Sequence, residues 1–225
     1  MGKVAGEGPV HRRCLRMEEL RRLIVENQIA ARGVRDRNVL DAMNCVPREC
    51  FVDRELRDRA YEDTPLPIGE GQTISQPFIV AYMIEAAQIT PGARVLEVGA
   101  GCGYAAAVVS RIAGSVYAVE RHASLGRAAA ERLRSLGYDN VELRVADGTK
   151  GWPEAAPFDA IIVSAGGTSV PEALEDQLAP DGVLVMPLGR DGRSQRLLRI
   201  RRSPDGHFEQ EDLGGVAFVP LVDGA

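Results

Sequence analysis

Two glutamates and a run of glycines in the middle of the chain have the spacing of a cofactor site. Residues 95–104 read Val-Leu-Glu-Val-Gly-Ala-Gly-Cys-Gly-Tyr, so glycine occupies every second position from Gly99 to Gly103. Glycine lets the backbone turn sharply and lets a ligand approach with no Cβ in the way. Glu97 lies just before the glycines, and Glu120 follows Gly99 by 21 residues. A carboxylate at that distance can accept both hydroxyls of a ribose, which predicts a cofactor containing a nucleoside.

The spacing of the glycines discriminates between two such cofactors, a nicotinamide dinucleotide and S-adenosylmethionine. A dinucleotide site needs the pattern G-x-G-x-x-G, but here Gly103 comes one residue early and Tyr104 follows it. The segment also carries no basic residue for a phosphate. Glu97 would repel a pyrophosphate, whereas it could bind the cationic methionyl end of S-adenosylmethionine. The pattern therefore favours the methyl donor.

A further candidate contact is the Asp147-Gly148 pair, which follows another apolar stretch. Asp-Gly pairs are common in turns, so a purely structural interpretation is open. An aspartate at the end of a strand can also present its carboxylate, or the next backbone N–H, to the edge of an adenine. Together with Gly99 and Glu120, we interpret the pair as part of the same cofactor site.

The elements that would position these residues alternate along the second half of the chain. From Arg94 onward short apolar strands alternate with amphipathic helices, which predicts a mostly parallel sheet covered on both faces. Ligands of such sheets bind outside the carboxyl ends of the strands, where the candidate residues lie. The predicted strands are 94–98, 115–120, 141–145, 160–164 and 183–187, the helices are 104–112, 124–136 and 171–178, and a terminal hairpin is formed by 195–201 and 216–220.

The first part of the chain has a different pattern, without the alternation of strands and helices. Its pattern is helical from Met17 to about Ala60, with apolar residues at three- and four-residue spacing and a second helix near residues 36–43. Residues 61–71 are too broken by proline and glycine for regular structure. An apolar helix follows at residues 78–87, and Ser75 stands where its N-cap would be.

Composition excludes several classes of function. A net charge of −5 gives no general attraction to nucleic acid or to an anionic membrane. The four cysteines form no C-x-x-C pair and the three histidines no metal-binding pattern, so we expect no metal. No apolar run approaches the length of about 20 residues that spans a bilayer. We therefore expect a cytoplasmic protein with reduced thiols, a monomer without nucleic-acid or membrane partners.

An arginine-rich stretch near the C-terminus has two interpretations. Clustered arginines are typical of RNA-binding surfaces. They also occur on edge strands, where charge discourages edge-to-edge aggregation. We favour a solvated edge strand. The arginines are Arg190, Arg193, Arg196, Arg199, Arg201 and Arg202.

The ordered motifs of the chain resemble the protein-L-isoaspartate O-methyltransferase family from about Met17 to Asp223. The glycine segment alone indicates only a methyltransferase, and the family signal lies in the other motifs. The resemblance implies a doubly wound, Rossmann-like S-adenosylmethionine-dependent methyltransferase fold with N-terminal helices and a C-terminal strand hairpin. The motifs are V-L-D-A-M-N-C-V-P-R-E-C-F-V (39–52), Y-E-D-T-P-L-P-I-G-E-G-Q-T-I-S-Q-P (61–77), A-D-G (146–148), A-P-F-D-A-I-I-V (156–163), V-P-E-A-L (170–174) and F-V-P-L (218–221).

The resemblance also implies roles for single residues. The serine of T-I-S-x-P is the active-site residue of the family, which corresponds to Ser75. One segment departs from the family pattern, because Ser164–Thr168 replaces an alanine-rich stretch and could widen the acceptor side. The cofactor contacts that the resemblance implies are Gln72, Thr73, Ile74, Ser75, Glu97, Gly99, Gly101, Glu120, Asp147 and Gly148.

The domain organisation follows from these assignments. We expect a flexible tail at residues 1–15 and a single methyltransferase domain at residues 16–225. Within that domain, residues 16–90 form a helical part that holds the active-site segment 72–77. Residues 91–190 form the cofactor-binding core, and residues 191–225 supply the C-terminal strands.

The implied activity is methyl transfer from S-adenosylmethionine to the free carboxylate of L-isoaspartyl residues in damaged proteins, with S-adenosylhomocysteine as product. An ionised carboxylate needs no general base, which agrees with the lack of a catalytic His–Asp or Cys–His pattern. The ester would collapse to a succinimide and so initiate repair. Two alternatives stay open: methylation of an ordinary aspartate in a dedicated precursor peptide, and a non-catalytic module that binds S-adenosylmethionine for regulation.

Overall fold

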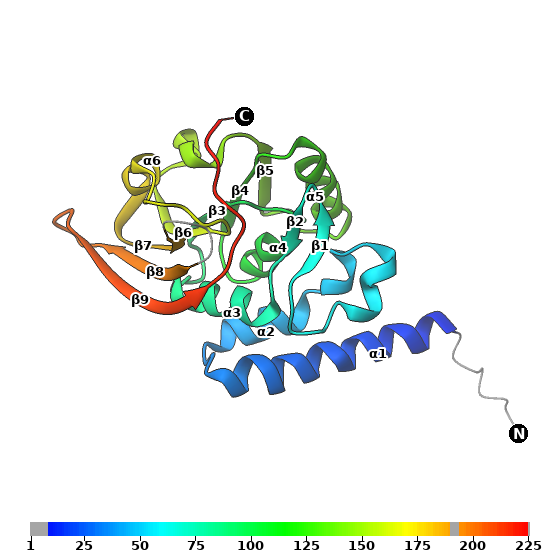
Figure 1. Cartoon of the computed structure of the whole chain (residues 1–225). Coiled ribbons are helices and arrows are strands. Elements are labelled where there is room, and N and C mark those ends of the chain that lie inside the picture. Colours follow the sequence, from blue (N-terminus) through cyan, green and yellow to red (C-terminus); the bar gives the residue numbers. More distant parts are fainter. Residues whose placement is uncertain (1–8, 190–193, 225) are drawn as a thin grey trace, which may run out of the picture.

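A central twisted sheet organises the molecule in a computed structural model, which describes residues 9–189 and 194–224. Seven strands of these described residues form the sheet in the order β5-β4-β3-β6-β7-β8-β9 (Figure 1). Strands β3, β4, β5, β6 and β7 run parallel to one another. Strand β8 pairs antiparallel with β7, and β9 pairs antiparallel with β8. The predicted doubly wound, mostly parallel sheet is therefore confirmed. The strands are β3 Arg94–Val98, β4 Ser115–Glu120, β5 Val141–Val145, β6 Phe158–Val163, β7 Leu178–Leu188, β8 Gln195–Arg202 and β9 Phe208–Val216.

The strand order has a reversal beside β3. The chain moves from β3 outward to β4 and β5, and then returns to place β6 on the other side of β3. Val98 pairs with Val119 on one side and with Val163 on the other. In open parallel sheets ligands bind at such a reversal, outside the carboxyl ends of the strands. The fold thus points to the ends of β3, β4 and β6.

Helices cover both faces of the sheet. Successive residues of a strand point to opposite faces, and accordingly Val95 packs into a large apolar cluster with the N-terminal helices while Leu96 packs into a smaller one with Leu174. The helices are α1 Pro9–Ile24, α2 Arg37–Cys45, α3 Pro77–Ala86, α4 Tyr104–Ser110, α5 Ala123–Ser135 and α6 Glu172–Asp176. Short turns of π- or 3₁₀-helix lie at Val25–Ile29, Ala30–Arg32, Arg48–Cys50, Arg54–Arg59, Gly148–Lys150 and Pro153–Ala155.

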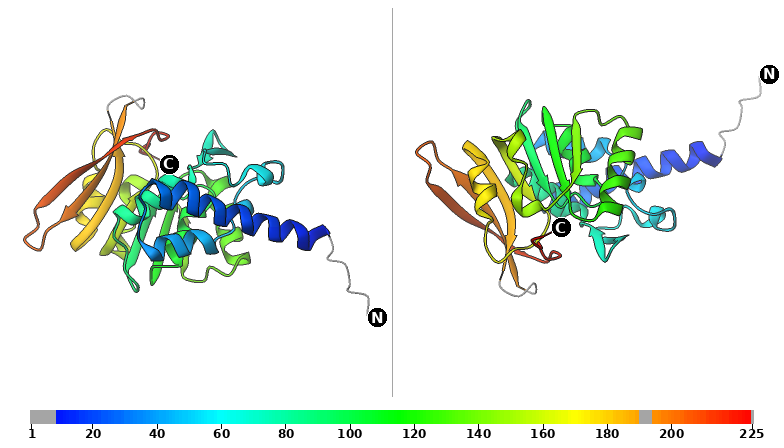
Figure 2. Two further views of the ribbon diagram at one scale, coloured as in Figure 1. Left: turned by 90° about the horizontal axis from the view of Figure 1, so that it is seen from below. Right: turned by 90° about the horizontal axis from the view of Figure 1, so that it is seen from above.

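The first helix begins earlier than the sequence predicted. Residues 1–15 were expected to form a flexible tail, but α1 starts at Pro9, and residues 1–8 lie outside the described part of the chain. Its first turns extend away from the body of the molecule (Figure 2). Leu15 is 47% exposed, so burial does not explain this extension. The arginines and the leucine of residues 9–15 have good helix propensity, and proline is tolerated in the first turn of a helix.

A small hairpin occupies part of the segment predicted to be irregular. Strand β1 (Leu66–Gly69) pairs antiparallel with β2 (Gln72–Ile74). The turn between them places Gly69, Glu70 and Gly71 at positive φ, where glycine is favoured. The glycines that argued against regular structure therefore belong to a tight turn.

The C-terminal hairpin lies at different residues from those predicted. The partner of β8 is β9 at Phe208–Val216, not residues 216–220, and β9 is the edge strand. The arginine-rich β8 is consequently an inner strand, which corrects the edge-strand interpretation. Its arginines pair across to acidic side chains of β9, as in the Arg196–Asp212 and Arg199–Glu211 ion pairs. Arg190 and Arg193 lie outside the described residues.

The last residues cross the sheet as an extended C-terminal segment (residues 217–224). The segment forms an isolated bridge with Gly166 after β6 and reaches Asp147 after β5. In Figure 1 it is the red coil that runs from the end of β9 to the C-terminus. It therefore lies over the end of the sheet where a ligand is expected. No helix among the described residues has the length and apolar character needed to cross a membrane.

Candidate active site

The loop after β3 holds three glycines in the left-handed region. The φ angles are +85° at Gly99, +55° at Gly101 and +86° at Gly103, a conformation that other residues rarely adopt. The backbone N–H groups of Gly99 and Ala100 donate to the carbonyl oxygen of Val119 at 2.9 and 3.1 Å. The loop is thereby bent over the end of β3 and tied to β4.

Glu120 at the end of β4 fixes the same loop from the other side. One carboxylate oxygen accepts the N–H of Gly101 at 2.8 Å and the other accepts the N–H of His122 at 2.8 Å. The side chain is 4% exposed. Each carboxylate oxygen keeps further acceptor capacity, so Glu120 can hold the loop and accept the two hydroxyls of a ribose at once.

Glu97 is a buried carboxylate with an unsatisfied oxygen. It is 1% exposed, and its Oε2 atom has no hydrogen-bond partner among the described residues. Burial, and then the negative charge of Glu120, raise the pKa of Glu97 to about 8, although a backbone hydrogen bond from Ala106 opposes this. Buried polar groups without partners are rare and destabilising. A cationic ligand group would supply the missing partner.

The segment that carries Ser75 is held by an aspartate outside it. The Asp63 carboxylate accepts the side-chain amide of Gln76 at 2.7 Å and the backbone N–H of Phe78 at 3.1 Å. The N-cap position of α3 is Gln76, with Pro77 as the first helical residue. The predicted N-cap role of Ser75 is therefore wrong, because Asp63 supplies the acceptor. The Ser75 hydroxyl is left for another use.

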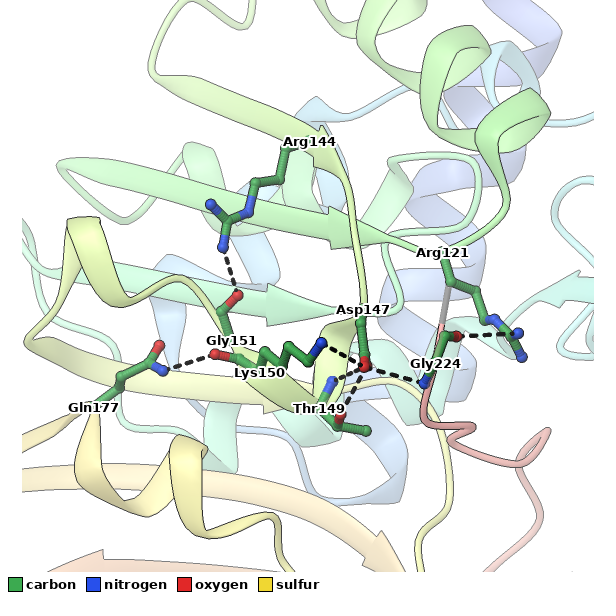
Figure 3. A network of polar contacts seen from close by, with 8 residues as sticks. All are labelled: Arg121, Arg144, Asp147, Thr149, Lys150, Gly151, Gln177 and Gly224. Atoms are coloured by element: carbon green, nitrogen blue, oxygen red, sulfur yellow. Dashed lines mark hydrogen bonds and ion pairs between the residues drawn. The ribbon is translucent and has the colours of Figure 1, made fainter.

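Asp147 is engaged in a network at the end of β5 (Figure 3). One carboxylate oxygen accepts the N–H and hydroxyl of Thr149 at 2.9 and 2.7 Å, and the other accepts the N–H of Gly224 at 3.1 Å. Burial alone would raise the pKa of Asp147, but the hydrogen bonds from Thr149 and Gly224, with the charge of Lys150, hold it below its usual range. Asp147 thus ties the C-terminal segment to the sheet.

Two small cavities bring most of the predicted residues together. The inner cavity, of about 50 Å³, lies between Ser75, Glu97 and the glycine loop. The outer cavity, of about 180 Å³, lies against Glu120 and Gly148. Asp147 is buried and lines neither cavity, whereas its neighbour Gly148 lines the outer one. The predicted residues that line one or both are Gln72, Thr73, Ile74, Ser75, Glu97, Gly99, Gly101, Glu120 and Gly148.

An open groove of about 1080 Å³ adjoins the inner cavity, and Ser75 lines both. One wall is α3, where the rings of Phe78 and Tyr82 stack at 5.6 Å. The Tyr82 hydroxyl donates to the carbonyl oxygen of Leu213 at 3.1 Å, which joins this wall to β9. The groove can therefore admit a chain-like acceptor to the Ser75 side of the inner cavity.

The C-terminal segment forms the wall that the groove and the outer cavity share. The Gln195 side chain accepts the Phe218 N–H at 2.7 Å and donates to the Phe218 carbonyl oxygen at 3.1 Å. Gly166 donates to Val219 and accepts from Leu221, both at 2.8 Å. Val219 lines both spaces. Sequence reasoning matched the F-V-P-L motif here but interpreted it as a strand.

Several residues of the site carry no local signal in the sequence. Asp63, Gln195 and Ser164 each act at a distance in the chain from the loop they support or the cavity they line. The departure at Ser164–Thr168 was the one hint to this region. In residues 9–189 and 194–224, no group of three or more His, Cys, Asp or Glu side chains is placed to hold a metal ion.

The arrangement suits group transfer from a small cofactor to a larger acceptor. Glu120 can bind a ribose, Glu97 offers an unpartnered carboxylate to a cation, and the loop glycines permit close approach. These features fit S-adenosylmethionine, which carries both a ribose and a cationic methionyl end. The groove leads an acceptor to the same point.

Comparison with known proteins agrees with this assignment. The sequence profile of the family described as "Protein-L-isoaspartate(D-aspartate) O-methyltransferase" matches residues 19–225. A protein-L-isoaspartate O-methyltransferase of Methylorubrum extorquens (strain PA1) is 60% identical over 206 residues, which cover 92% of this chain and 90% of that protein. One of Pelobacter propionicus is 54% identical over 215 residues, covering 95% and 96% of the two chains.

Solved structures show the same similarity in three dimensions. A protein-L-isoaspartate O-methyltransferase superposes with a TM-score of 0.81 at 31% identity, over 91% of this chain and 65% of that longer chain. A Plasmodium falciparum protein of the same name, in complex with S-adenosyl-L-homocysteine, superposes with a TM-score of 0.78 at 27% identity, over 91% and 99%. The fold class predicted from the sequence is confirmed.

Proposed function

The chain belongs to the protein-L-isoaspartate (D-aspartate) O-methyltransferase family, and from this premise we propose how its site performs the family reaction. The enzyme transfers a methyl group from S-adenosylmethionine to the free carboxylate of L-isoaspartyl residues in proteins and peptides. One observation carries the proposal: Ser75 lines both the inner cavity beside Glu97 and the open groove. Donor and acceptor can meet where the inner cavity adjoins the groove.

The residues that line the two cavities bind the cofactor. Glu120 accepts the ribose hydroxyls, and Glu97 binds the cationic methionyl end. Gly99 and Gly101 let the backbone approach, and Gly148 forms the wall beside the adenine. Asp147 reaches the adenine edge only if its oxygen exchanges the Gly224 N–H for the base.

Catalysis needs placement more than proton transfer. When bound, S-adenosylmethionine supplies a methyl group whose bond to the sulfonium sulfur can be broken by a nucleophile that attacks from the opposite side. The acceptor carboxylate is already ionised at neutral pH, so no residue has to remove a proton. Ser75 orients the carboxylate by donating its hydroxyl proton, with the nucleophile held about 3 Å from the methyl carbon. Val80, Met83 and Ile84 of α3 line the inner cavity and keep water from the reacting atoms. A neighbouring backbone amide nitrogen of the substrate then attacks the methyl ester and expels methanol, which gives a succinimide. Water reopens this ring in part to a normal aspartyl bond.

Ser75→Ala tests this assignment. The substitution removes a hydrogen bond to a charged group, so kcat/KM for an isoaspartyl peptide should fall by about ten- to a hundredfold. The dissociation constant for S-adenosylmethionine should change little. Ser135→Ala, at an exposed position at the end of α5, is the matched control and should behave as wild type. A Ser75→Ala variant with full activity would contradict the role of Ser75.

The state of Glu97 predicts that cofactor binding depends on pH. With its pKa raised to about 8, Glu97 is protonated at neutral pH in the free enzyme. A bound cation favours the ionised form, so binding should release a proton and the affinity should rise with pH toward about 8. Isothermal titration in buffers of different ionisation enthalpy measures that proton. Glu97→Gln should bind more weakly and lose the pH dependence.

The same shift has a consequence for stability. Because the pKa of Glu97 in the folded protein lies above the ordinary value of 4.5, its protonated form is favoured by folding. That contribution is fully present below about pH 4.5 and is lost as pH rises through about 8. The free energy of unfolding of Glu97→Gln should therefore fall less over this range than that of wild type. An equal fall in both proteins would contradict the shift.

We further propose that the enzyme acts in the cytoplasm as a monomer, without nucleic-acid or membrane partners. Cys14, Cys45, Cys50 and Cys102 are all free thiols, as expected in a reducing compartment. The net charge of −5 gives no general attraction to polyanions. Its macromolecular partners are then the isoaspartyl proteins that it methylates.

A further inference from the structure

Ser164 occupies the point where the sheet reverses its strand order. It follows β6 directly, and its backbone N–H donates to the carbonyl oxygen of Val98 at 2.8 Å. It faces the first glycine of the cofactor loop, because a Cβ built on Gly99 would lie 3.7 Å from the Cβ of Ser164. This backbone hydrogen bond holds Ser164 in place, so its side-chain hydroxyl is not needed for that purpose.

Ser164 also stands where the cavities meet. Together with Thr73 it lines the inner cavity, the outer cavity and the open groove. Ser75, in the loop between β2 and α3, also lines the inner cavity and the groove. No hydrogen bond to the Ser164 hydroxyl is formed by the residues that the structure describes. A hydroxyl without a partner therefore borders the place where donor and acceptor meet.

The acceptor has two carboxylate oxygens, and a single donor cannot fix both. A carboxylate held only by Ser75 could rotate about that hydrogen bond, and its attacking oxygen would leave the line of displacement. A second donor from another segment of the site would remove this freedom. The effect is one of placement, because the negative charge of the acceptor is lost during transfer and extra charge stabilisation would not speed the reaction.

We propose that Ser164 is a second catalytic hydroxyl, which donates to the acceptor carboxylate opposite Ser75 and orients its attacking oxygen. This inference rests on the proposed function and adds a residue to it. Ser164 then supplies a hydrogen-bond donor to the acceptor site.

Steady-state kinetics on Ser164→Ala test the proposal, with an isoaspartyl peptide as acceptor. We expect kcat/KM for the peptide to fall by about tenfold or more, with an unchanged dissociation constant for S-adenosylmethionine and an unchanged melting temperature. Ser164→Thr keeps the hydroxyl and should retain most of the activity. Ser169→Ala is the matched control, since Ser169 is exposed on the same connection and lines none of the three spaces.

A double variant tests whether the two hydroxyls act on one group. If Ser75 and Ser164 hold the same carboxylate, the loss in Ser75→Ala/Ser164→Ala should be smaller than the product of the single losses. Independent, multiplying losses would overturn the shared role. So would wild-type kinetics in Ser164→Ala, or a loss matched by weaker cofactor binding. Activity of the wild-type enzyme on the peptide tests the proposed function separately, because the role of Ser164 is read from the ratio of variant to wild type.

Discussion

Replacing Glu120 by alanine should weaken S-adenosylmethionine binding by about a hundredfold or more. The carboxylate is the proposed acceptor for two ribose hydroxyls, and hydrogen bonds to a charged group contribute about 1.5–3 kcal/mol each. It also accepts the N–H groups of Gly101 and His122 at 2.8 Å. Its removal therefore takes away two contacts to the cofactor and loosens the loop that shapes the site. Equilibrium binding of the cofactor measures the loss.

Glu120→Gln separates these two effects. The amide is nearly the same size but offers one acceptor oxygen in place of two. It should keep one of the two backbone contacts and bind the cofactor more tightly than Glu120→Ala, but more weakly than wild type. Unchanged affinity in both variants would show that Glu120 serves the loop alone and that the ribose binds elsewhere.

Valine at position 101 should abolish measurable cofactor binding. Gly101 has a φ of +55°, lines both small cavities, and a Cβ there would lie 3.1 Å from the Cδ1 atom of Ile68 in the β1–β2 hairpin. A branched side chain would enter the space that the cofactor needs. It would also carry the strain of the left-handed conformation, about 1–3 kcal/mol.

Gly137→Val is the control that isolates the strain. Gly137 follows α5 with a φ of +74°, and a Cβ there would meet no atom within 4 Å. Both variants should therefore unfold at lower temperature than wild type, but Gly137→Val should bind the cofactor normally. Normal binding in Gly101→Val would mean that the cofactor does not lie against this glycine.

The sequence predicted those parts of the site whose signals are local. The strand, the glycine loop and the helix follow one another directly between Arg94 and Ser110, so a local pattern predicts them. Glu120 then ends the next strand, at the spacing of one strand–helix–strand unit. Each element there buries an apolar run, so that periodicity and function coincide. The resemblance to a family then placed Ser75 beside this core, although the contacts that leave its hydroxyl uncommitted were not foreseen.

The parts that the sequence did not predict depend on contacts between distant segments. Asp63 takes the capping role assigned to Ser75 because it reaches α3 from 15 residues upstream. The Asp147 carboxylate accepts the N–H of Gly224, 77 residues later. Local turn patterns cannot predict a contact between residues so far apart. Strand β9 was not predicted because most of its side chains are exposed, so it has no apolar pattern. Its acidic side chains instead form ion pairs with arginines of β8. The alternation of arginines with the later acidic residues was the signal that could have revealed it.

The function is tested most directly by methyl transfer to a pair of short peptides that differ only in an isoaspartyl or an aspartyl residue. The wild-type enzyme with labelled S-adenosylmethionine should place base-labile label on the isoaspartyl peptide alone. Label on the aspartyl peptide would indicate a tailoring enzyme with another acceptor. Cofactor binding without label on either peptide would contradict the repair function and support a regulatory module.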